Sequence, residues 1–281
     1  MNGTKTRGND AKKVFKELGT CSRTFYYLLN REFEHLNEIE ERASDPLAGG
    51  IMQQGQQCGM LWGATLAVGA ESYRRSNNKN QAIGLAITST KYLMESFFKN
   101  THTVNCRDIT KCDLDSFFGM AKFILKTTFK GIENSICFNL TEKWAPEAIK
   151  SAKEGLAQQQ KSLPMQSMSC ASEVARKMGA NDEEVIAVAG FAGGLGLSGN
   201  ACGALSAAIW KNSITWSKLH PEKSTWKNQN AKDTLKAFKD ETDSEMLCHN
   251  ICGRRFKNIE DHTEFISNGG CKNLINILAR S

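Results

Sequence analysis

The sequence predicts an all-α protein built from two tandem homologous helical units that pack about a pseudo-two-fold axis. Apolar residues recur with helical spacing over several long segments, whereas alternating β-branched runs are rare and the 281 residues include only four prolines. The ten cysteines fall into two ordered sets, one in each half. These patterns argue against an all-β fold and indicate an internal duplication.

Composition and charge narrow the class of protein. Charged residues make up 23% of the chain and hydrophobic residues 40%, as in a globular protein rather than a disordered tail or a membrane-embedded chain. The net charge of +6 is too small to make nucleic acid the expected partner. Residues 1–10 are polar and hold no apolar core of signal-peptide length, so we expect a cytoplasmic protein with reduced cysteines.

Seven segments have the apolar spacing and the composition of helices. They are residues 14–37, 81–99, 114–130, 142–160, 170–178, 231–239 and 272–280. Gly19 and Gly179 stand where a left-handed helix cap is favoured. We expect five or so helices in each half and little or no sheet.

Two uncharged stretches, residues 46–70 and 185–210, are each about as long as a membrane-spanning helix. Both are interrupted by glycine and polar residues, with the run 53–57 in the first and 198–200 in the second. A lipid-facing span would seldom contain such interruptions. Two short buried helices joined at a glycine turn are therefore expected in each stretch, and no membrane span.

The duplication is clearest around one cysteine of each half. Residues 48–59 align with residues 192–203 without a gap, and the alanine, the three glycines before the cysteine, the cysteine and the glycine after it all coincide. The other cysteines then pair in order: Cys21 with Cys170, Cys58 with Cys202, Cys106 with Cys248, Cys112 with Cys252, and Cys137 with Cys271. A duplicated unit usually packs against its twin as a homodimer would.

The boundary between the units is expected near residues 155–166, where a run of glutamines is followed by Pro164. This gives a first unit of residues 1–160 and a second of residues 161–281.

Cys58 and Cys202 each precede an apolar run that is rich in small residues. This places their sulfurs at or near a helix N-terminus, where the helix dipole favours the thiolate form. The thiolate is the form that binds metal or attacks a disulfide. The same small residues also suit close helix packing alone.

These cysteine motifs resemble those of the C_GCAxxG_C_C family of redox-active proteins. The resemblance occurs twice and covers nearly the whole chain. The first motif, Cys58-Gly59-Met60-Leu61-Trp62-Gly63, has methionine in place of the family's alanine, and the second, Cys202-Gly203-Ala204-Leu205-Ser206-Ala207, ends in alanine. The resemblance implies a redox chemistry but no substrate. The eight cysteines that match its pattern are Cys21, Cys58, Cys106 and Cys137, then Cys170, Cys202, Cys248 and Cys271.

Iron–sulfur binding is our leading interpretation of these cysteines. Four thiolates in each half match the ligand count of a [4Fe–4S] or [2Fe–2S] centre, and only five histidines are present, which favours a site of sulfur ligands. Cys112 and Cys252 lie outside the four-cysteine pattern and would extend the ligand set or serve a cluster of higher nuclearity. All ten cysteines are thus candidate metal ligands, for electron transfer or for a reduction.

Two other chemistries remain open for the same sulfurs. In thiol–disulfide exchange, Cys58 and Cys202 would be the attacking thiols, although the chain has neither a Cys-x-x-Cys motif nor a thioredoxin-like pattern. A structural Cys₄ zinc site would make the chain an interaction protein, but only Cys248 and Cys252 have the short spacing typical of zinc. Haem attachment is not indicated.

A few further residues lie near the cysteines in sequence. His102, Asp108 and His249 are candidates to tune a cluster or carry protons, although a solvated loop role is more common. Trp62 and Trp210 are expected in the core. Residues 211–257 carry many basic side chains interleaved with aromatic ones. Acidic residues in the same segment dilute this positive charge, which favours a solvated face. Docking of an acidic redox partner protein is the alternative. A small-molecule substrate and a homo-oligomer are also compatible with the sequence.

Overall fold

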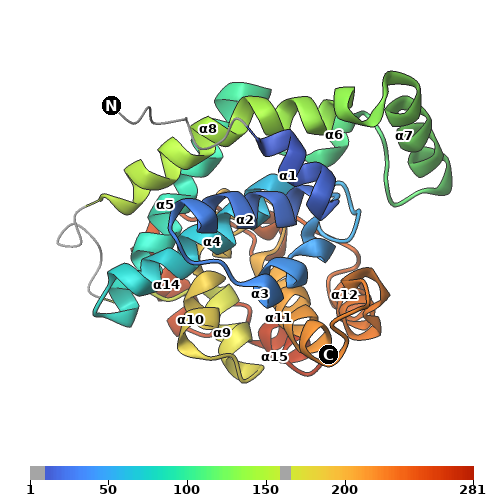
Figure 1. Cartoon of the computed structure of the whole chain (residues 1–281). Helices are drawn as coiled ribbons and strands as arrows, with labels where there is room; N and C mark the ends of the chain where they lie inside the picture. Colours follow the sequence, from blue (N-terminus) through green and yellow to red (C-terminus); the bar gives the residue numbers. More distant parts are fainter. Residues whose placement is uncertain (1–9, 159–165) are drawn as a thin grey trace, which may run out of the picture.

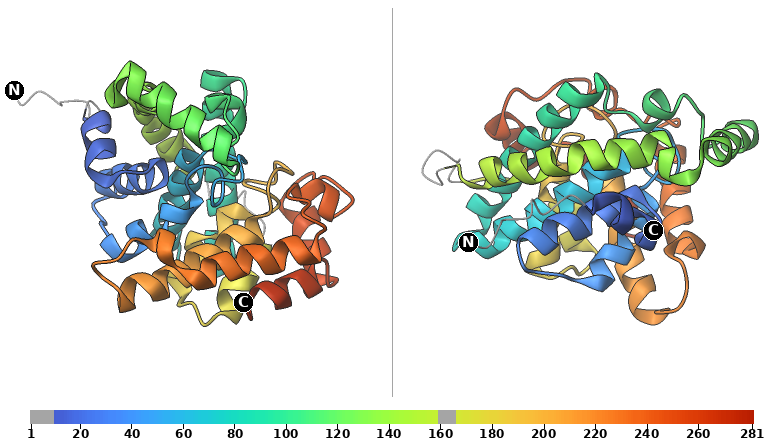
Figure 2. Two further views of the ribbon diagram at one scale, coloured as in Figure 1. Left: turned by 90° about the vertical axis from the view of Figure 1, so that its right-hand side faces the viewer. Right: turned by 45° about the horizontal axis from the view of Figure 1, so that its top comes forward.

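The computed structural model describes residues 10–158 and 166–281, and these residues form an all-helical protein (Figure 1). Within these two ranges no strand is present, and the only bridges are the isolated pairs Gln57–Asn105 and Ala201–Leu247. The predicted all-α class is confirmed. In Figure 1 and in the left-hand view of Figure 2, the first half of the chain lies mostly above the second half, which is coloured yellow to red.

The helices of the first half are separated by short loops and two 3₁₀ turns. They are α1 (Ala11–Leu18), α2 (Cys21–Glu32), α3 (Glu38–Ala43), η1 (Asp45–Leu47), α4 (Gly59–Arg75), α5 (Lys79–Thr101), α6 (Cys106–Thr110), α7 (Phe117–Lys130), η2 (Ile132–Asn134) and α8 (Ile136–Leu156).

The second half repeats the order of α-helices from α2 onward, and several of its helices are shorter than their counterparts. Its elements are α9 (Cys170–Lys177), α10 (Asp182–Ala187), η4 (Ala189–Phe191), α11 (Gly203–Leu219), η5 (Thr225–Lys227), α12 (Gln229–Glu241), α13 (Cys248–Ile251), α14 (Ile259–Ser267) and α15 (Lys272–Leu278).

Several predicted helices need correction. The segment 14–37 is not one helix, because Gly19 adopts a φ of 82° that ends α1, and Asn37 begins α3 as its N-cap. The helix expected from residue 142 begins at Ile136 and contains Pro146. Each half also holds more than the expected five or so helices, because short helices of four to six residues carry too little periodicity to be seen in a sequence.

The duplication extends to individual backbone hydrogen bonds around the motif cysteines. The N–H of Cys58 donates to the carbonyl of Val104 (2.8 Å), and the N–H of Cys202 donates to Met246 (2.9 Å). In return, Cys106 donates to Gln56 (2.7 Å) and Cys248 donates to Asn200 (2.6 Å). In each half, a reciprocal pair of backbone hydrogen bonds therefore joins the start of the long helix after the motif cysteine, α4 or α11, to the start of the short helix, α6 or α13.

The two halves contact each other reciprocally. Helix α4 packs against α10, and its counterpart α11 packs against α3, the counterpart of α10. Such a reciprocal pair of contacts is the mark of a two-fold relationship. Gly69 permits the close approach, because a Cβ there would lie 2.2 Å from the carbonyl oxygen of Ala187. The predicted packing about a pseudo-two-fold axis agrees with this geometry.

One hydrophobic core runs through both halves and includes Trp62 and Trp210, each fully buried as predicted. Gln57 crosses the interface: its amide nitrogen donates to the carbonyl of Gly194 (3.2 Å) and its amide oxygen accepts from the N–H of Ala201 (3.2 Å). The predicted boundary at residues 160 and 161 lies outside the described residues and stays a prediction.

The uncharged stretches 46–70 and 185–210 differ from the expected pair of helices. In each, a 3₁₀ turn (η1 or η4) leads into a glycine-rich loop and then into a long helix, α4 or α11. Gly49, Gly50 and Gly55 all have positive φ in the first loop, which makes the turn too tight for a second α-helix. Among the described helices, none has both the length and the apolar character needed to cross a membrane.

Candidate functional site

Nearly every cysteine lies at the beginning of a helix. Cys21, Cys106, Cys170 and Cys248 are the first residues of α2, α6, α9 and α13, whereas Cys58, Cys202 and Cys271 are the N-caps of α4, α11 and α15, and Cys137 is the second residue of α8. The sequence predicted this position for Cys58 and Cys202, and the structure extends it to all eight cysteines of the family pattern. Free backbone N–H groups at helix starts favour anionic sulfur.

The five cysteines of the first half come together. Cys21 and Cys58 are hydrogen-bonded through their thiols, and Cys58 also interacts electrostatically with Cys106 and Cys137. Cys112 lies next to Cys106 in a small hydrophobic cluster with Leu114. All ten cysteines are free thiols.

The five cysteines of the second half also come together, and all of them line one small cavity of about 10 Å³. The Sγ atoms of Cys248 and Cys252 are 3.8 Å apart, and those of Cys252 and Cys271 are 3.5 Å apart. The rest of the wall is mostly apolar and includes Phe256 and Phe265. Each half therefore assembles its own set of thiols. The sequence alone did not decide whether the two halves have separate sites or share one.

Backbone N–H groups donate to the first cysteine of each set. The N–H of Gly49 donates to the sulfur of Cys21, and the N–H of the equivalent Gly193 donates to Cys170. The N–H groups of Ala204 and Leu205, in the first turn of α11, donate to Cys202. The glycine-rich loops and helix starts thus present donors to sulfur, and such hydrogen bonds stabilise the thiolate and tune metal–sulfur centres.

Burial is the main cause of the raised pKa values of Cys106, Cys137, Cys170 and Cys202. It raises the pKa of Cys137, Cys170 and Cys202 to about 12. The pKa of Cys58 lies well above its usual range, because the hydrogen bond to Cys21 and then burial disfavour the thiolate. In the metal-free chain the expected lowering of the pKa at Cys58 and Cys202 is therefore wrong.

Cys21 is the exception, since its pKa is lowered by the hydrogen bond from Cys58 and by the backbone donors. A buried thiolate elsewhere in these groups requires a compensating positive charge.

His262 is a residue of the second group that sequence reasoning missed. Its side chain is 1% exposed and lines the same cavity as the five sulfurs, and its Nδ1 lies 3.1 Å from the carbonyl oxygen of Met168. This contact makes Nδ1 the protonated nitrogen and leaves Nε2 as the acceptor. Burial lowers the pKa of His262 to about 4. Its place between Ile259 and Ile266 on the buried face of α14 was the available signal.

The three polar candidates near the cysteines have other contacts. The Nδ1 atom of His249 lies 2.7 Å from the carbonyl oxygen of Gly199. Asp108 accepts hydrogen bonds from Thr103 and Asn105, and His102 packs against Phe98. Asp108 lies in α6, His249 lies in α13 and His102 is the C-cap of α5, so these residues belong to helices rather than to the expected loops.

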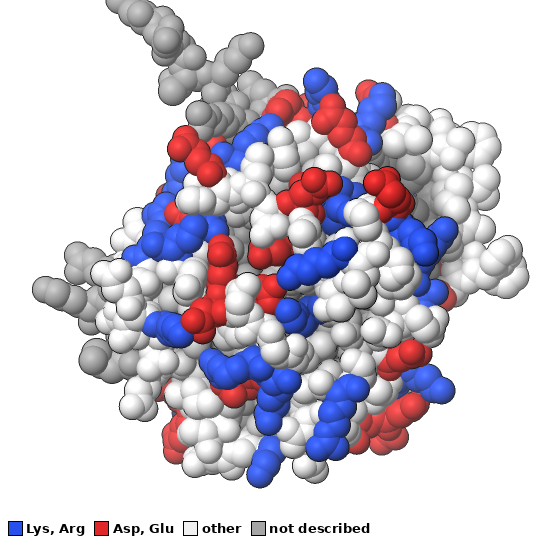
Figure 3. Space-filling model, turned by 60° about the horizontal axis from the view of Figure 1, so that its bottom comes forward, with Lys and Arg blue, Asp and Glu red and all other residues white. Residues whose placement is uncertain are grey.

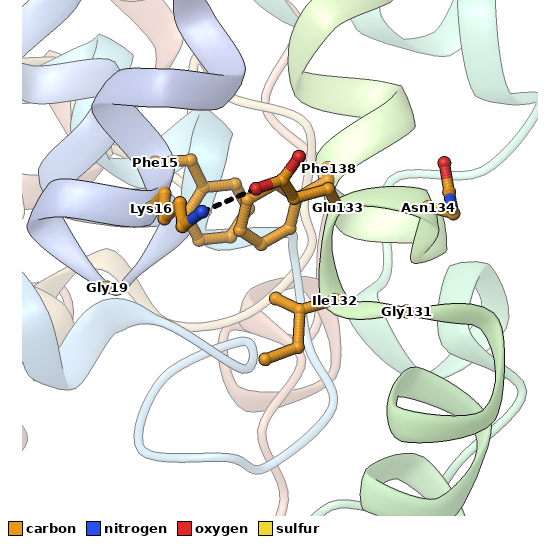
Figure 4. A pocket seen from close by; sticks show the side chains of 8 residues that line it. All are labelled: Phe15, Lys16, Gly19, Gly131, Ile132, Glu133, Asn134 and Phe138. Atoms are coloured by element: carbon orange, nitrogen blue, oxygen red, sulfur yellow. Dashed lines mark hydrogen bonds and ion pairs between the residues drawn. The ribbon is translucent and has the colours of Figure 1, made fainter.

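A larger pocket of about 600 Å³ lies beside the first group (Figure 4). Phe15 and Phe138 stack in its wall with ring centroids 4.4 Å apart, and Lys16 bonds to Glu133 across it at 2.6 Å. Phe138 directly follows Cys137 in α8. The pocket can therefore hold a small molecule next to the turn of α8 that carries Cys137.

Among the described residues, no group of three or more His, Cys, Asp or Glu side chains is arranged to hold a single metal ion. The thiols fit a sulfur-ligated centre by their chemistry: five soft donors in each group, backbone donors to the sulfurs and, in the second group, a mostly apolar enclosure.

Comparison with known proteins gives one match. No curated protein and no solved structure matches the chain. The family model described as "Putative redox-active protein (C_GCAxxG_C_C)" matches residues 20–150 and again residues 166–280. These two segments contain the two cysteine groups and cover most of the sequence. The chain therefore belongs to the C_GCAxxG_C_C family and carries the family's unit twice.

Proposed function

We propose that this protein is a redox protein that holds iron–sulfur clusters on its cysteine thiolates and acts in electron transfer or in a reduction. The observation that carries the proposal is the convergence of ten cysteines from distant parts of the chain into two equivalent groups of five. Packing alone does not require five cysteines to meet at one place in each half, whereas a centre ligated by thiolates does.

The cysteines that would hold a cluster occupy equivalent positions in the two halves. Cys21, Cys58, Cys106 and Cys137 would supply the first set of ligands, with Cys112 beside them. Cys170, Cys202, Cys248 and Cys271 would supply the second, with Cys252 beside them. A bound cluster would supply one-electron chemistry, the N–H donors of the glycine loops and helix starts would tune its potential, and the apolar walls would exclude water.

Thiol–disulfide exchange is the second candidate, favoured by one observation. Cys252 lies within 3.8 Å of both Cys248 and Cys271, so a disulfide in this group needs little movement. Against it stand the raised pKa values of both Cys252 and Cys271, which hydrogen bonding between neighbouring thiols and burial keep protonated. A structural zinc site remains the third reading of the same sulfurs.

The deciding experiment is the iron and acid-labile sulfide content, with a visible spectrum, of protein purified without oxygen. We expect several irons and matching sulfide per chain. Cys58→Ser and Cys202→Ser should each remove about half of the iron, since each affects one group. His249→Asn is the matched control, because this histidine lies beside Cys248 but contacts Gly199. Stoichiometric zinc alone, or no metal with thiols that oxidise reversibly in pairs, would overturn the proposal.

Electron transfer also requires a partner, and residues 211–257 remain our candidate docking region for an acidic redox protein. Acidic residues are interleaved with the basic ones in this segment, as they are on the face of the molecule in Figure 3, so any attraction is modest. A sharp fall in the rate of electron transfer with added salt would support this docking. A rate that does not depend on salt would contradict it.

A further inference from the structure

Helix α7 carries an apolar surface that the fold of the protein does not use. Five large side chains on it are more than half exposed: Phe117 (82%), Phe118 (84%), Ile124 (55%), Leu125 (56%) and Phe129 (86%). Monomeric soluble proteins rarely expose a contiguous set of this kind without a function. In Figure 1 and in the right-hand view of Figure 2, the helix projects from one end of the molecule.

The second half of the chain shows that the cysteine group does not need this surface. Helix α14 holds the equivalent position there, between the short cysteine helix and the final cysteine, and it buries Ile259, His262 and Ile266. Helix α7 has 14 residues, whereas α14 has nine. The exposed apolar residues are thus a feature that distinguishes the first half from its duplicate.

The rotation of α7 about its own axis is fixed by contacts on its other side. Met120 and Phe123 pack against the cluster of Cys106, Cys112 and Leu114. At the start of the helix, the hydroxyl of Ser116 accepts from the N–H of Gly119 (3.0 Å). A Cβ on Gly119 would lie 1.9 Å from the carbonyl oxygen of Asp113, so the helix and the preceding loop are tightly joined. The phenylalanines therefore point outward because the opposite face is anchored.

The charge of the helix is of one sign. Residues 117–130 contain lysines at positions 122, 126 and 130 and no acidic residue. Lys122 and Lys126, four residues apart, lie in one row along the side of the apolar face. Lys122 and Lys126 are exposed. Nearby acids are engaged elsewhere, because Asp113 pairs with Arg107 at 2.8 Å and Asp115 accepts from Gln54 at 2.8 Å.

We propose that α7 docks on an anionic lipid surface, with its phenylalanines in the boundary between headgroups and acyl chains and its lysines against the lipid phosphates. An amphipathic helix with aromatic residues on one face and lysines beside them is the form that binds such surfaces. The broad apolar face suits a bilayer, which adapts to spread side chains, and lysine stems can extend to the headgroups. The wide uncharged area at the right-hand edge of Figure 3 lies at the end of the molecule where Figure 1 places α7.

The test is flotation of the full-length protein, as purified, with two kinds of vesicle. One is phosphatidylcholine alone, and the other is phosphatidylcholine mixed with phosphatidylglycerol. We expect co-flotation with the anionic vesicles, weakened by salt. The variant Phe117→Ser/Phe118→Ser/Phe129→Ser should bind about tenfold more weakly or worse, and Lys122→Gln/Lys126→Gln should lose the preference for anionic lipid.

The matched control is Leu219→Ser, which replaces a side chain that is 70% exposed on a different helix and should leave binding unchanged. Because all the replaced residues are exposed, thermal unfolding followed by circular dichroism should be unaltered in each variant. Flotation with neither kind of vesicle would overturn the proposal, as would equal binding by the triple variant. A dimer that the phenylalanine substitutions dissociate would assign the face to a second copy of the chain instead, and overturn it too.

Discussion

The Sγ of Cys252 lies 3.5 Å from the Sγ of Cys271, although Cys252 is not one of the four cysteines that define the family's unit. From the sequence, this cysteine lies outside the four-cysteine pattern and is expected to extend the ligand set or serve a larger cluster. Its contacts with both Cys248 and Cys271 make it a full member of the second thiol group.

This proximity predicts which disulfide forms first. In reduced, metal-free protein treated with diamide, we expect Cys252 and Cys271 to join before other pairs, as detected by peptide mass spectrometry. The reaction should be faster at pH 9 than at pH 7, because both pKa values are raised and the thiolate is the attacking form.

The equivalent cysteine of the first half provides the control. Cys252→Ser should abolish this disulfide, whereas Cys112→Ser should leave it intact. Equal rates at both pH values, or a first disulfide that links the two halves, would be inconsistent with the geometry.

The glycine after each motif cysteine is required by close packing. In Gly59→Ala, the new Cβ would lie 2.6 Å from the Cys21 sulfur and 2.9 Å from the Cα of Ala48. In Gly203→Ala, it would lie 1.9 Å from the carbonyl oxygen of Phe191. We expect each substitution to lower the free energy of unfolding by about 1–3 kcal/mol, measured by urea denaturation.

Gly179→Asn is the comparison for these substitutions. Gly179 has a φ of 73° but open space around it, and asparagine tolerates this conformation. Its urea midpoint should stay close to that of the unaltered protein. A midpoint for Gly59→Ala that matches that of Gly179→Asn would show that the contact with Cys21 is not tight.

Glu40 makes stability depend on pH near neutrality. Burial, and then the charges of Glu183 and Glu184, raise its pKa from 4.5 to about 7, while the hydrogen bond from Tyr26 lowers it. Between pH 4.5 and 7 the folded chain keeps a proton that the unfolded chain has lost. Stability should therefore fall as the pH rises through this window, by roughly 3 kcal/mol from this group.

Glu40→Gln keeps an acceptor for Tyr26 without the charge. We expect it to be more stable than the unaltered protein at pH 8 and to lose this part of the pH dependence in chemical unfolding. Glu38→Gln, an exposed position on the same helix, should retain it. If the free energy of unfolding changes with pH equally in both variants, ionisation of the Glu40 carboxyl does not destabilise the folded protein.

His262 acts on stability in the opposite direction. Its pKa falls from 6.5 to about 4, because burial among the cysteines, Phe256 and Phe265 disfavours the charged ring. Below pH 6.5 the unfolded chain binds a proton that the folded chain does not. Stability should therefore fall as the pH drops from 6.5 to 4, again by roughly 3 kcal/mol.

In His262→Gln, the amide can still donate to Met168, but this position no longer carries a group that titrates. We expect thermal unfolding to become less sensitive to acid, whereas His35→Gln, at an exposed position, should behave like the unaltered protein. An unchanged acid sensitivity in His262→Gln would place the titrating group elsewhere.

The sequence by itself determined the helical class, the duplication and the five cysteine pairs. These are local or repetitive features. The spacing of apolar residues along a helix can be recognised within one continuous segment, and a duplicated segment keeps its glycines and cysteines in the same order. It also placed Cys58 and Cys202 at helix starts, since a glycine and then an apolar run follow each of them.

Only the tertiary structure decided how these parts combine. Burial raised the pKa of Cys202 to about 12, which the favourable helix position alone would have lowered, because desolvation depends on neighbours distant in sequence. His262 joins the second thiol group through the packing of α14, and Phe118 is exposed because Met120 and Phe123 fix the opposite face of α7. Which face of a helix meets the core, and which sulfurs meet each other, are set by long-range packing that no short stretch of sequence contains.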